Sequence, residues 1–219
     1  MQSSSAPHTM DQQPPTQPAA PGPYPRQLAI KPTAFRDFEI HPNDGGDNDN
    51  NTAPIYYCSV ARMGINKPDI LLQSGAKGGP VAGASHYRSS RSIICGVGAD
   101  ETSMIWTKLQ HVGFLSGHFE FDWQGRKYAL RRASGEEIGA SALRSLVGLQ
   151  FKVVDEATGR IVALFVSHSA VGRRRPATLK FVEGLEAEFE TVVVLGVLSW
   201  KDKIRRTRAR GAAAGGAGA

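Results

Sequence analysis

The sequence predicts a mostly β protein, namely a closed antiparallel barrel of about a dozen strands around one buried hydrophobic C-terminal helix. Three observations lead to this fold class. Short runs rich in β-branched and aromatic residues, separated by turn residues, fill most of the chain. Two pairs of these runs form clear hairpins. The stretch FETVVVLGVLSW, residues 189–200, is apolar on every side, and a helix of that kind must be buried on every side.

The chain begins with an arm, residues 1 to about 26, that is rich in Pro, Gln, Ser and Ala. It carries too little apolar surface to offset its chain entropy, so we expect it to be disordered. It has no apolar core of a secretory signal peptide. Cys58 and Cys95 each lie within an apolar run, which suggests reduced, buried thiols. These features predict an intracellular protein, either cytoplasmic or attached peripherally to a membrane.

The predicted barrel domain covers residues 27–210 and is followed by a flexible Ala/Gly tail, residues 211–219. Its first half consists of short strand-like runs bounded by Pro, Gly and Asn. In chain order these runs are LAIKPTAFRDFEI (28–40), PIYYCSVARM (54–63), PDILLQSG (68–75), GPVAGASHYR (79–88), SIICGVG (92–98) and MIWTKLQHVG (104–113).

Two hairpins follow. In GHFEFDWQGRKYALRRAS, residues 117–134, aromatic and charged residues alternate up to a tight Gln124-Gly125 turn. In LQFKVVDEATGRIVALFVSHS, residues 149–169, we expect Gly159 to supply the positive φ that ends the turn. The second strand of that hairpin is apolar on both faces, so both faces should be covered. The segment between the hairpins fits either a short helix or a loop. ATLKFVEG, residues 177–184, is the last expected strand.

The closing segment is predicted to be a helix from about residue 185 to about residue 206. Three consecutive valines favour a strand, but apolar residues recur at steps of three and four, which favours a helix. Glu186, Glu188 and Glu190 near its start and lysines and arginines near its end suit the helix dipole. A membrane span needs about 20 apolar residues, and this run is interrupted by Glu190 and by Lys201-Asp202-Lys203.

These elements resemble the tubby C-terminal-like superfamily, which includes tubby domains, LURP-one-related proteins and phospholipid scramblases. The likeness covers roughly residues 28–208. Its motifs are KPDILLQSG, MIWTKLQ, FDWQGRKYALRR, FKVVDEATGRIVALF and FETVVVLGVLSWKDKIRR. More narrowly, the chain resembles a fungal family with this superfamily's pattern, from which no activity carries over. The resemblance implies a closed antiparallel barrel threaded by its C-terminal helix. It also implies phosphoinositide binding through surface Lys and Arg, although no binding motif maps residue by residue.

No catalytic or metal-binding motif is recognisable. The histidines lack the i, i+4 spacing of a metal pair, and neither cysteine belongs to a Cys-x-x-Cys. GVGADE, residues 96–101, lacks the Lys-Ser/Thr of a P-loop. The sequence therefore predicts a non-enzymatic binding module with no metal and no cofactor.

The basic residues point to an anionic ligand. Residues 171–210 hold most of the excess behind the formal net charge of +6. The candidate lipid- or anion-binding residues are Arg173, Arg174, Arg175, Lys180, Lys201, Lys203, Arg205 and Arg206. The alternative for both clusters is a solvated surface. Two other functions remain open: an adaptor that binds proteins through the Pro-rich arm, and nucleic-acid binding through RRTRARG, which lacks aromatic residues to stack on bases.

Overall fold

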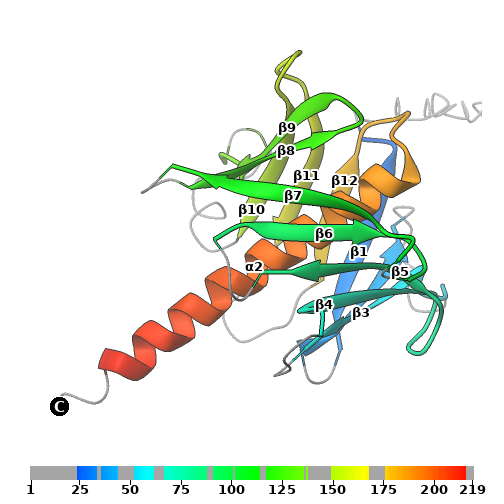
Figure 1. The fold of residues 1–219 in the computed structure, drawn as a ribbon, viewed down its shortest axis with the longest axis vertical. Helices are drawn as coiled ribbons and strands as arrows, with labels where there is room; N and C mark the ends of the chain where they lie inside the picture. Colours follow the sequence, from blue (N-terminus) through cyan, green and yellow to red (C-terminus); the bar gives the residue numbers. More distant parts are fainter. Residues whose placement is uncertain are drawn as a thin grey trace, which may run out of the picture.

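The computed structural model describes residues 24–33, 36–43, 52–61, 67–87, 91–100, 102–113, 117–135, 137, 149–167 and 176–215. In this part of the chain, twelve antiparallel strands close into a barrel around one helix, α2 (Figure 1). The predicted fold class is therefore confirmed. The strands are β1 (Arg26–Pro32), β2 (Phe38–Pro42), β3 (Tyr56–Val60), β4 (Ile70–Ser74), β5 (Val81–His86), β6 (Ile93–Val97), β7 (Ile105–Val112), β8 (His118–Trp123), β9 (Arg126–Arg132), β10 (Gln150–Asp155), β11 (Ile161–Ser167) and β12 (Ala177–Phe181).

Each strand pairs with its neighbours in the chain, and β1 pairs with β12 to close the ring. Arg26 lies opposite Phe181 and Ile30 opposite Ala177. Closure leaves no sheet edge with unpaired backbone groups. β1 begins at Arg26, and Tyr24 already packs against the core, so the domain starts slightly earlier than expected. The expectation of disorder for residues 1–23 falls outside the described residues.

Both predicted hairpins are present. β8 and β9 are joined by Gln124 and Gly125, with φ angles of 48° and 76°. Positive φ at both positions is the geometry that matches the twist of a two-residue hairpin. Gly159, in the turn between β10 and β11, has a φ of 69°, as predicted. Residues 162–165 of β11 are all buried, so both faces of this strand are covered, again as predicted.

α2 (Ala187–Gly215) fills the barrel. Every residue from 189 to 200 is buried, which explains the all-round apolar pattern. Phe189 packs against Tyr128, with ring centroids 4.6 Å apart, and Trp200 stacks on Phe151 at 4.3 Å. A Cβ at Gly196 would lie 2.8 Å from Leu109 Cδ2, so a glycine is needed here for the helix to approach β7 closely.

α2 starts close to the expected residue but continues to Gly215 instead of ending near Arg206. The Ala-rich sequence after residue 210 has high helix propensity, which accounts for the extension into the expected tail. Figure 1 shows this end projecting well beyond the strands. In the part of the chain that the structure describes, no helix has both the length and the hydrophobicity of a membrane span.

The barrel has two distinct ends. We call the end where α2 begins, after β12, the entry end, and the end where α2 leaves the strands the exit end. Because consecutive strands are antiparallel, every odd-numbered strand finishes at the exit end and every even-numbered strand starts there. Segments far apart in the sequence therefore meet around the emerging helix.

Candidate anion-binding site at the helix exit

Asp202 is the anchor of the exit end. Its carboxylate is buried and accepts a hydrogen bond of 2.6 Å from the Tyr87 hydroxyl. It also accepts hydrogen bonds from the guanidinium groups of Arg205 and Arg206. Burial alone would raise the pKa of Asp202, but the hydrogen bonds from Arg206 and Tyr87 outweigh it and lower this pKa. Asp202 therefore remains ionised and holds two of the predicted arginines.

Lys201 lies inside the exit end rather than on its surface. Its ammonium group is 5.1 Å from the centroid of the Phe38 ring and 5.6 Å from that of Phe165. Burial, and then the nearby Arg205, lower the pKa of Lys201 to about 8. The two aromatic faces favour the cation, yet removal from water outweighs them. Lys201 is thus a structural lysine with little access to an external ligand.

Lys203 and Arg206 fasten the helix to the barrel rim. The Lys203 amine donates to the carbonyl of Tyr87 at 3.0 Å, and the Arg206 guanidinium donates to the carbonyl of Ala61 at 3.1 Å. Arg205 differs from both, because 43% of its side-chain surface stays exposed although it pairs with Asp202. Of the helix cations predicted as candidates, Arg205 is the one that remains available to a ligand.

Lys180, another predicted candidate, is not brought to this site. Lys180 is paired with Gln27 and Leu164 near the end of β12, which lies toward the entry end. The structure therefore separates Lys180 from the candidates on α2, which are Lys201, Lys203, Arg205 and Arg206. Arg173, Arg174 and Arg175 lie outside the described residues, so their part in binding stays a prediction.

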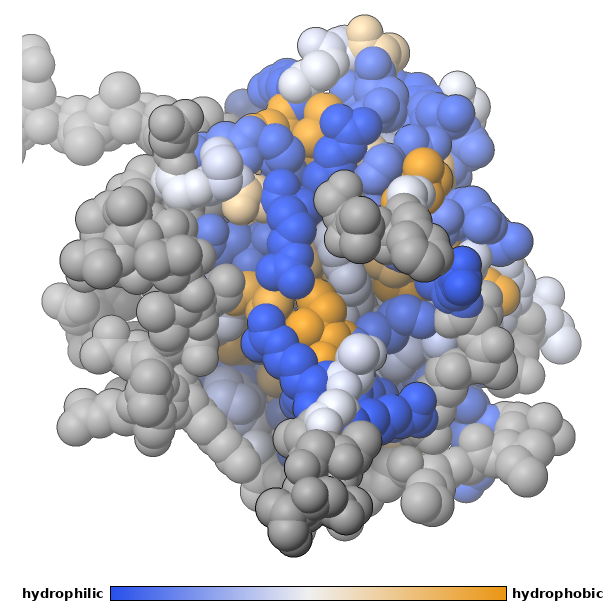
Figure 2. All heavy atoms as spheres, turned by 90° about the vertical axis from the view of Figure 1, so that its left-hand side faces the viewer, coloured by the Kyte–Doolittle hydropathy of each residue, from blue (hydrophilic) through white to orange (hydrophobic). Residues whose placement is uncertain are grey.

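Exposed cations surround the helix exit. They come from the β1–β2, β3–β4 and β5–β6 connections, from the end of β9 and from α2 itself. These residues, which we call the exit cations, are Arg36, Lys67, Arg91, Arg132, Arg205, Arg208 and Arg210. Figure 2 views the molecule from the side on which α2 projects, where hydrophilic side chains cover most of the described surface and leave small hydrophobic patches between them.

Sequence reasoning missed Arg36, Lys67, Arg91 and Arg132 because they are isolated along the chain. The strand numbering could have revealed them, since each lies where an odd-numbered strand ends or an even-numbered strand begins, and both positions are at the exit end. Asp37, Asp69 and Glu137 also lie near the exit end, where they accept hydrogen bonds from the protein, and their negative charges offset part of the positive charge of the more numerous exit cations.

The cations at this end act on one another. The pKa of Arg132 is lowered by burial and then by Arg208. The pKa of His111 is lowered by burial and then by Arg91 and Lys203. An anion placed among these groups would relieve their mutual repulsion. The electrostatics of the exit end therefore favour a negatively charged ligand.

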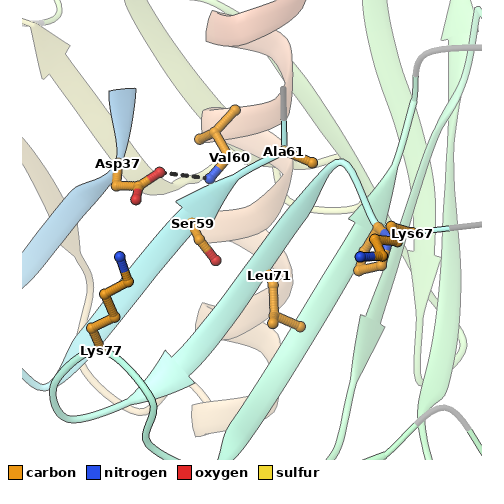
Figure 3. Close-up of a pocket in the computed structure, with 8 residues that line it drawn as sticks. Asp37, Ser59, Val60, Ala61, Lys67, Leu71 and Lys77 are labelled. Atoms are coloured by element: carbon orange, nitrogen blue, oxygen red, sulfur yellow. Dashed lines mark hydrogen bonds between the residues drawn. The ribbon is translucent and has the colours of Figure 1, made fainter. Parts of the chain in front are cut away.

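A surface pocket of about 320 Å³ adjoins the exit end on the outer face of β3 and β4 (Figure 3). Ser59 and Leu71, which are paired in register, form part of its floor. The carboxylate of Asp37 accepts hydrogen bonds from the Tyr57 hydroxyl at 2.8 Å and the Val60 amide at 3.0 Å. The residues that line the pocket are Asp37, Ser59, Val60, Ala61, Lys67, Pro68, Leu71 and Lys77.

Two exposed lysines flank this pocket. In Figure 3, Lys77 and Lys67 lie on opposite sides of Ser59 and Leu71. Ala61 lines the pocket and accepts the hydrogen bond from Arg206, so the pocket is continuous with the helix exit. The apolar floor of the pocket and the lysine ammonium groups at its rim suit a small anionic ligand that also has an apolar part.

Among the described residues, no group of three or more His, Cys, Asp and Glu side chains is placed to hold a metal ion. Both cysteines are buried and free, as predicted, and burial raises the pKa of each thiol. Comparisons of the chain with protein-family models, with curated proteins and with solved structures give no match.

Proposed function

We propose that this protein is a non-enzymatic binding module that attaches peripherally to anionic lipid surfaces through the exit cations. The observation that carries the proposal is their convergence around one end of the barrel from distant parts of the sequence. Near an anionic bilayer each Lys or Arg contributes about 1 kcal/mol, so several together give measurable attachment without an inserted helix.

The architecture supports the same proposal. A closed barrel threaded by its C-terminal helix is what the resemblance to the tubby C-terminal-like superfamily implies. In this chain the helix occupies the barrel interior with packed side chains, so ligands meet the outer surface and the rim. Phosphoinositides are the finer form of the proposal, because their phosphorylated headgroups offer several charges to a cluster of arginines and lysines.

Vesicle sedimentation tests the proposal. The full chain is mixed at low salt with phosphatidylcholine vesicles, phosphatidylcholine–phosphatidylserine vesicles, and vesicles that contain a phosphoinositide. We expect sedimentation with the two anionic compositions and its loss as salt rises, because screening weakens exposed charges. Equal sedimentation with neutral and anionic vesicles would contradict the proposal. Binding to DNA that competes fully with vesicles would point to a general polyanion site instead.

A further inference from the structure

The pocket on the outer face of β3 and β4, which we call the β3–β4 pocket, is separate from the proposed membrane site, because Lys67 alone of its lining residues belongs to the exit cations. Its volume of about 320 Å³ is at the lower limit for pockets that hold small organic ligands. A standard protein interface involves about 20–30 residues on each side, and eight residues line this pocket. The size of the pocket therefore favours a small molecule over a protein partner.

The floor of the pocket offers apolar surface to a ligand. Ser59 on β3 and Leu71 on β4 lie directly opposite each other, and both side chains are only partly buried. The small side chain of Ser59 leaves space beside Leu71, and Pro68 and Ala61 extend the apolar surface toward the exit end. An apolar group placed here would remove more of Leu71 from water, which is favourable.

Lys77 is positioned at one side of the pocket before any ligand binds. Its ammonium group is 5.8 Å from the centroid of the Tyr57 ring. The turn that carries Lys77 is braced by Gln73, whose side chain donates to the carbonyl of Gly79 at 3.2 Å and accepts from the amide of Gly78 at 3.3 Å. Positioning of this kind lowers the cost of ordering the site when a ligand binds.

The excess positive charge of the pocket lies at Lys67. In Figure 3, Asp37 is on the same side of Ser59 as Lys77, so the carboxylate offsets the charge of that lysine. Lys67 is exposed and lies on the opposite side. The cations that line the pocket are lysines, and a lysine offers a point charge instead of the paired donors with which arginine grips a phosphate. A carboxylate with a single negative charge therefore suits this site.

We infer that the β3–β4 pocket binds a small amphipathic monocarboxylate, such as a short fatty acid, with its carboxylate at Lys67 and its apolar part over Leu71. This inference goes beyond the proposed function and does not depend on it, because the ligand binds from solution and needs no bilayer. The two parts of the site act together: Lys67 selects for the charge and the floor selects for the chain.

Titration followed by NMR tests the inference on the full chain, without lipid and at low salt. The probes are hexanoate, 1-hexanol, which lacks the charge, and acetate, which lacks the chain. We expect hexanoate to bind with a Kd on the order of 1 mM and to shift the amide signals of Ser59 and Leu71. We expect 1-hexanol to bind about three- to fivefold more weakly and acetate at least about tenfold more weakly. Equal affinity of hexanoate and either control compound would overturn the inference.

Variants locate the site. Lys67→Gln removes the charge and should weaken hexanoate binding about three- to fivefold, whereas Leu71→Asn removes the apolar floor and should abolish it. The matched control is Lys108→Gln, at an exposed lysine of β7, which should bind like the wild type. Unchanged binding by Lys67→Gln would overturn the inference, and this exposed substitution should leave the melting temperature unchanged.

The two proposals fail separately. If hexanoate binds but the wild type does not sediment with anionic vesicles, the proposed function is wrong and the monocarboxylate site stands. If the wild type sediments with anionic vesicles but hexanoate does not bind, the monocarboxylate site is wrong and the proposed function stands.

Discussion

Tyr87, directly after β5, donates a 2.6 Å hydrogen bond to Asp202 on α2, and the two residues are 115 positions apart in the sequence. This bond ties the wall of the barrel to the helix at the point where the helix leaves it. The same carboxylate binds Arg205 and Arg206. The contact therefore determines both how the exit end is held and which cations face solvent.

Tyr87→Phe should destabilise the protein by about 1–3 kcal/mol, because a buried, charged carboxylate loses a hydrogen-bond donor. The ring itself is kept, so packing of this buried side chain is unchanged. Urea unfolding measures the effect. The control is Tyr56→Phe, at a partly exposed residue of β3, which should have almost no effect. Equal stability of the Tyr87 variant and the wild type would show that the bond contributes nothing.

Asp202→Asn should remove a pH-dependent part of the stability. The lowered pKa of Asp202 stabilises the folded state above the usual carboxylate range. This contribution is lost as pH falls through the folded pKa, and the variant should lack that acid-dependent step. Because Arg205 and Arg206 lose their counter-charge, the variant should also bind anionic vesicles more tightly. Weaker vesicle binding by a folded variant would contradict this reading of the site.

Lys201→Met should stabilise the protein at pH 7 by roughly 1–3 kcal/mol, because it removes a charge from a buried position. The folded pKa of Lys201, about 8, lies below the ordinary lysine value of 10.5. Between these values the unfolded chain holds a proton that the folded chain has released, so wild-type stability should rise with pH in this window.

Denaturation at pH 7 and at pH values between 8 and 10.5 measures both effects of Lys201. The Met variant should be more stable than the wild type at pH 7, and its stability should not rise with pH between 8 and 10.5. Lys201→Arg keeps the charge and does not titrate in this range. Its stability should therefore not rise with pH between 8 and 10.5, and it should not exceed that of the wild type at pH 7. A less stable Met variant would mean that the contacts with Phe38 and Phe165 outweigh the cost of burial.

Val194→Asp should cost roughly 4–5 kcal/mol or more, because Val194 is 1% exposed at the centre of the helix-filled barrel and a carboxylate there has no partner. Thermal unfolding measures the effect. Ala209→Asp, on the exposed projecting part of α2, is the matched control and should keep the melting temperature. An unchanged melting temperature for the Val194 variant is incompatible with an enclosed helix.

The barrel and its helix could be predicted because their signals are periodic and local. Alternation around Gln124-Gly125 and the turn glycine Gly159 indicate hairpins, and an apolar run bounded by Glu190 and Lys201 indicates a buried helix. Helix length was less predictable. Residues after 206 make no apolar contribution to the pattern, so only the helix propensity of the alanines after residue 210 indicated that the helix continues to Gly215.

The candidate site was only partly predictable because burial and topology act over long distances. The sequence shows that Lys201 and Lys203 are charged but not that Phe38 or Tyr87 lies beside them. Arg36 and Arg91 become neighbours of the helix exit only after the strands close into a ring. Likewise, SIICGV contains two adjacent isoleucines, and the pattern alone does not say that Ile93 faces inward and Ile94 outward.

A charge-reversal comparison tests whether the exit end of the barrel is the part that holds an anionic membrane. One variant carries Arg208→Glu and Arg210→Glu on the projecting helix, and the other carries Arg160→Glu and Lys180→Glu, which lie toward the entry end. Both change the net charge equally, and sedimentation with phosphatidylcholine–phosphatidylserine vesicles is measured at low salt. We predict binding at least about tenfold weaker for the helix variant and near wild-type binding for the entry-end variant. Equal loss in both variants, or loss only in the entry-end variant, would contradict it.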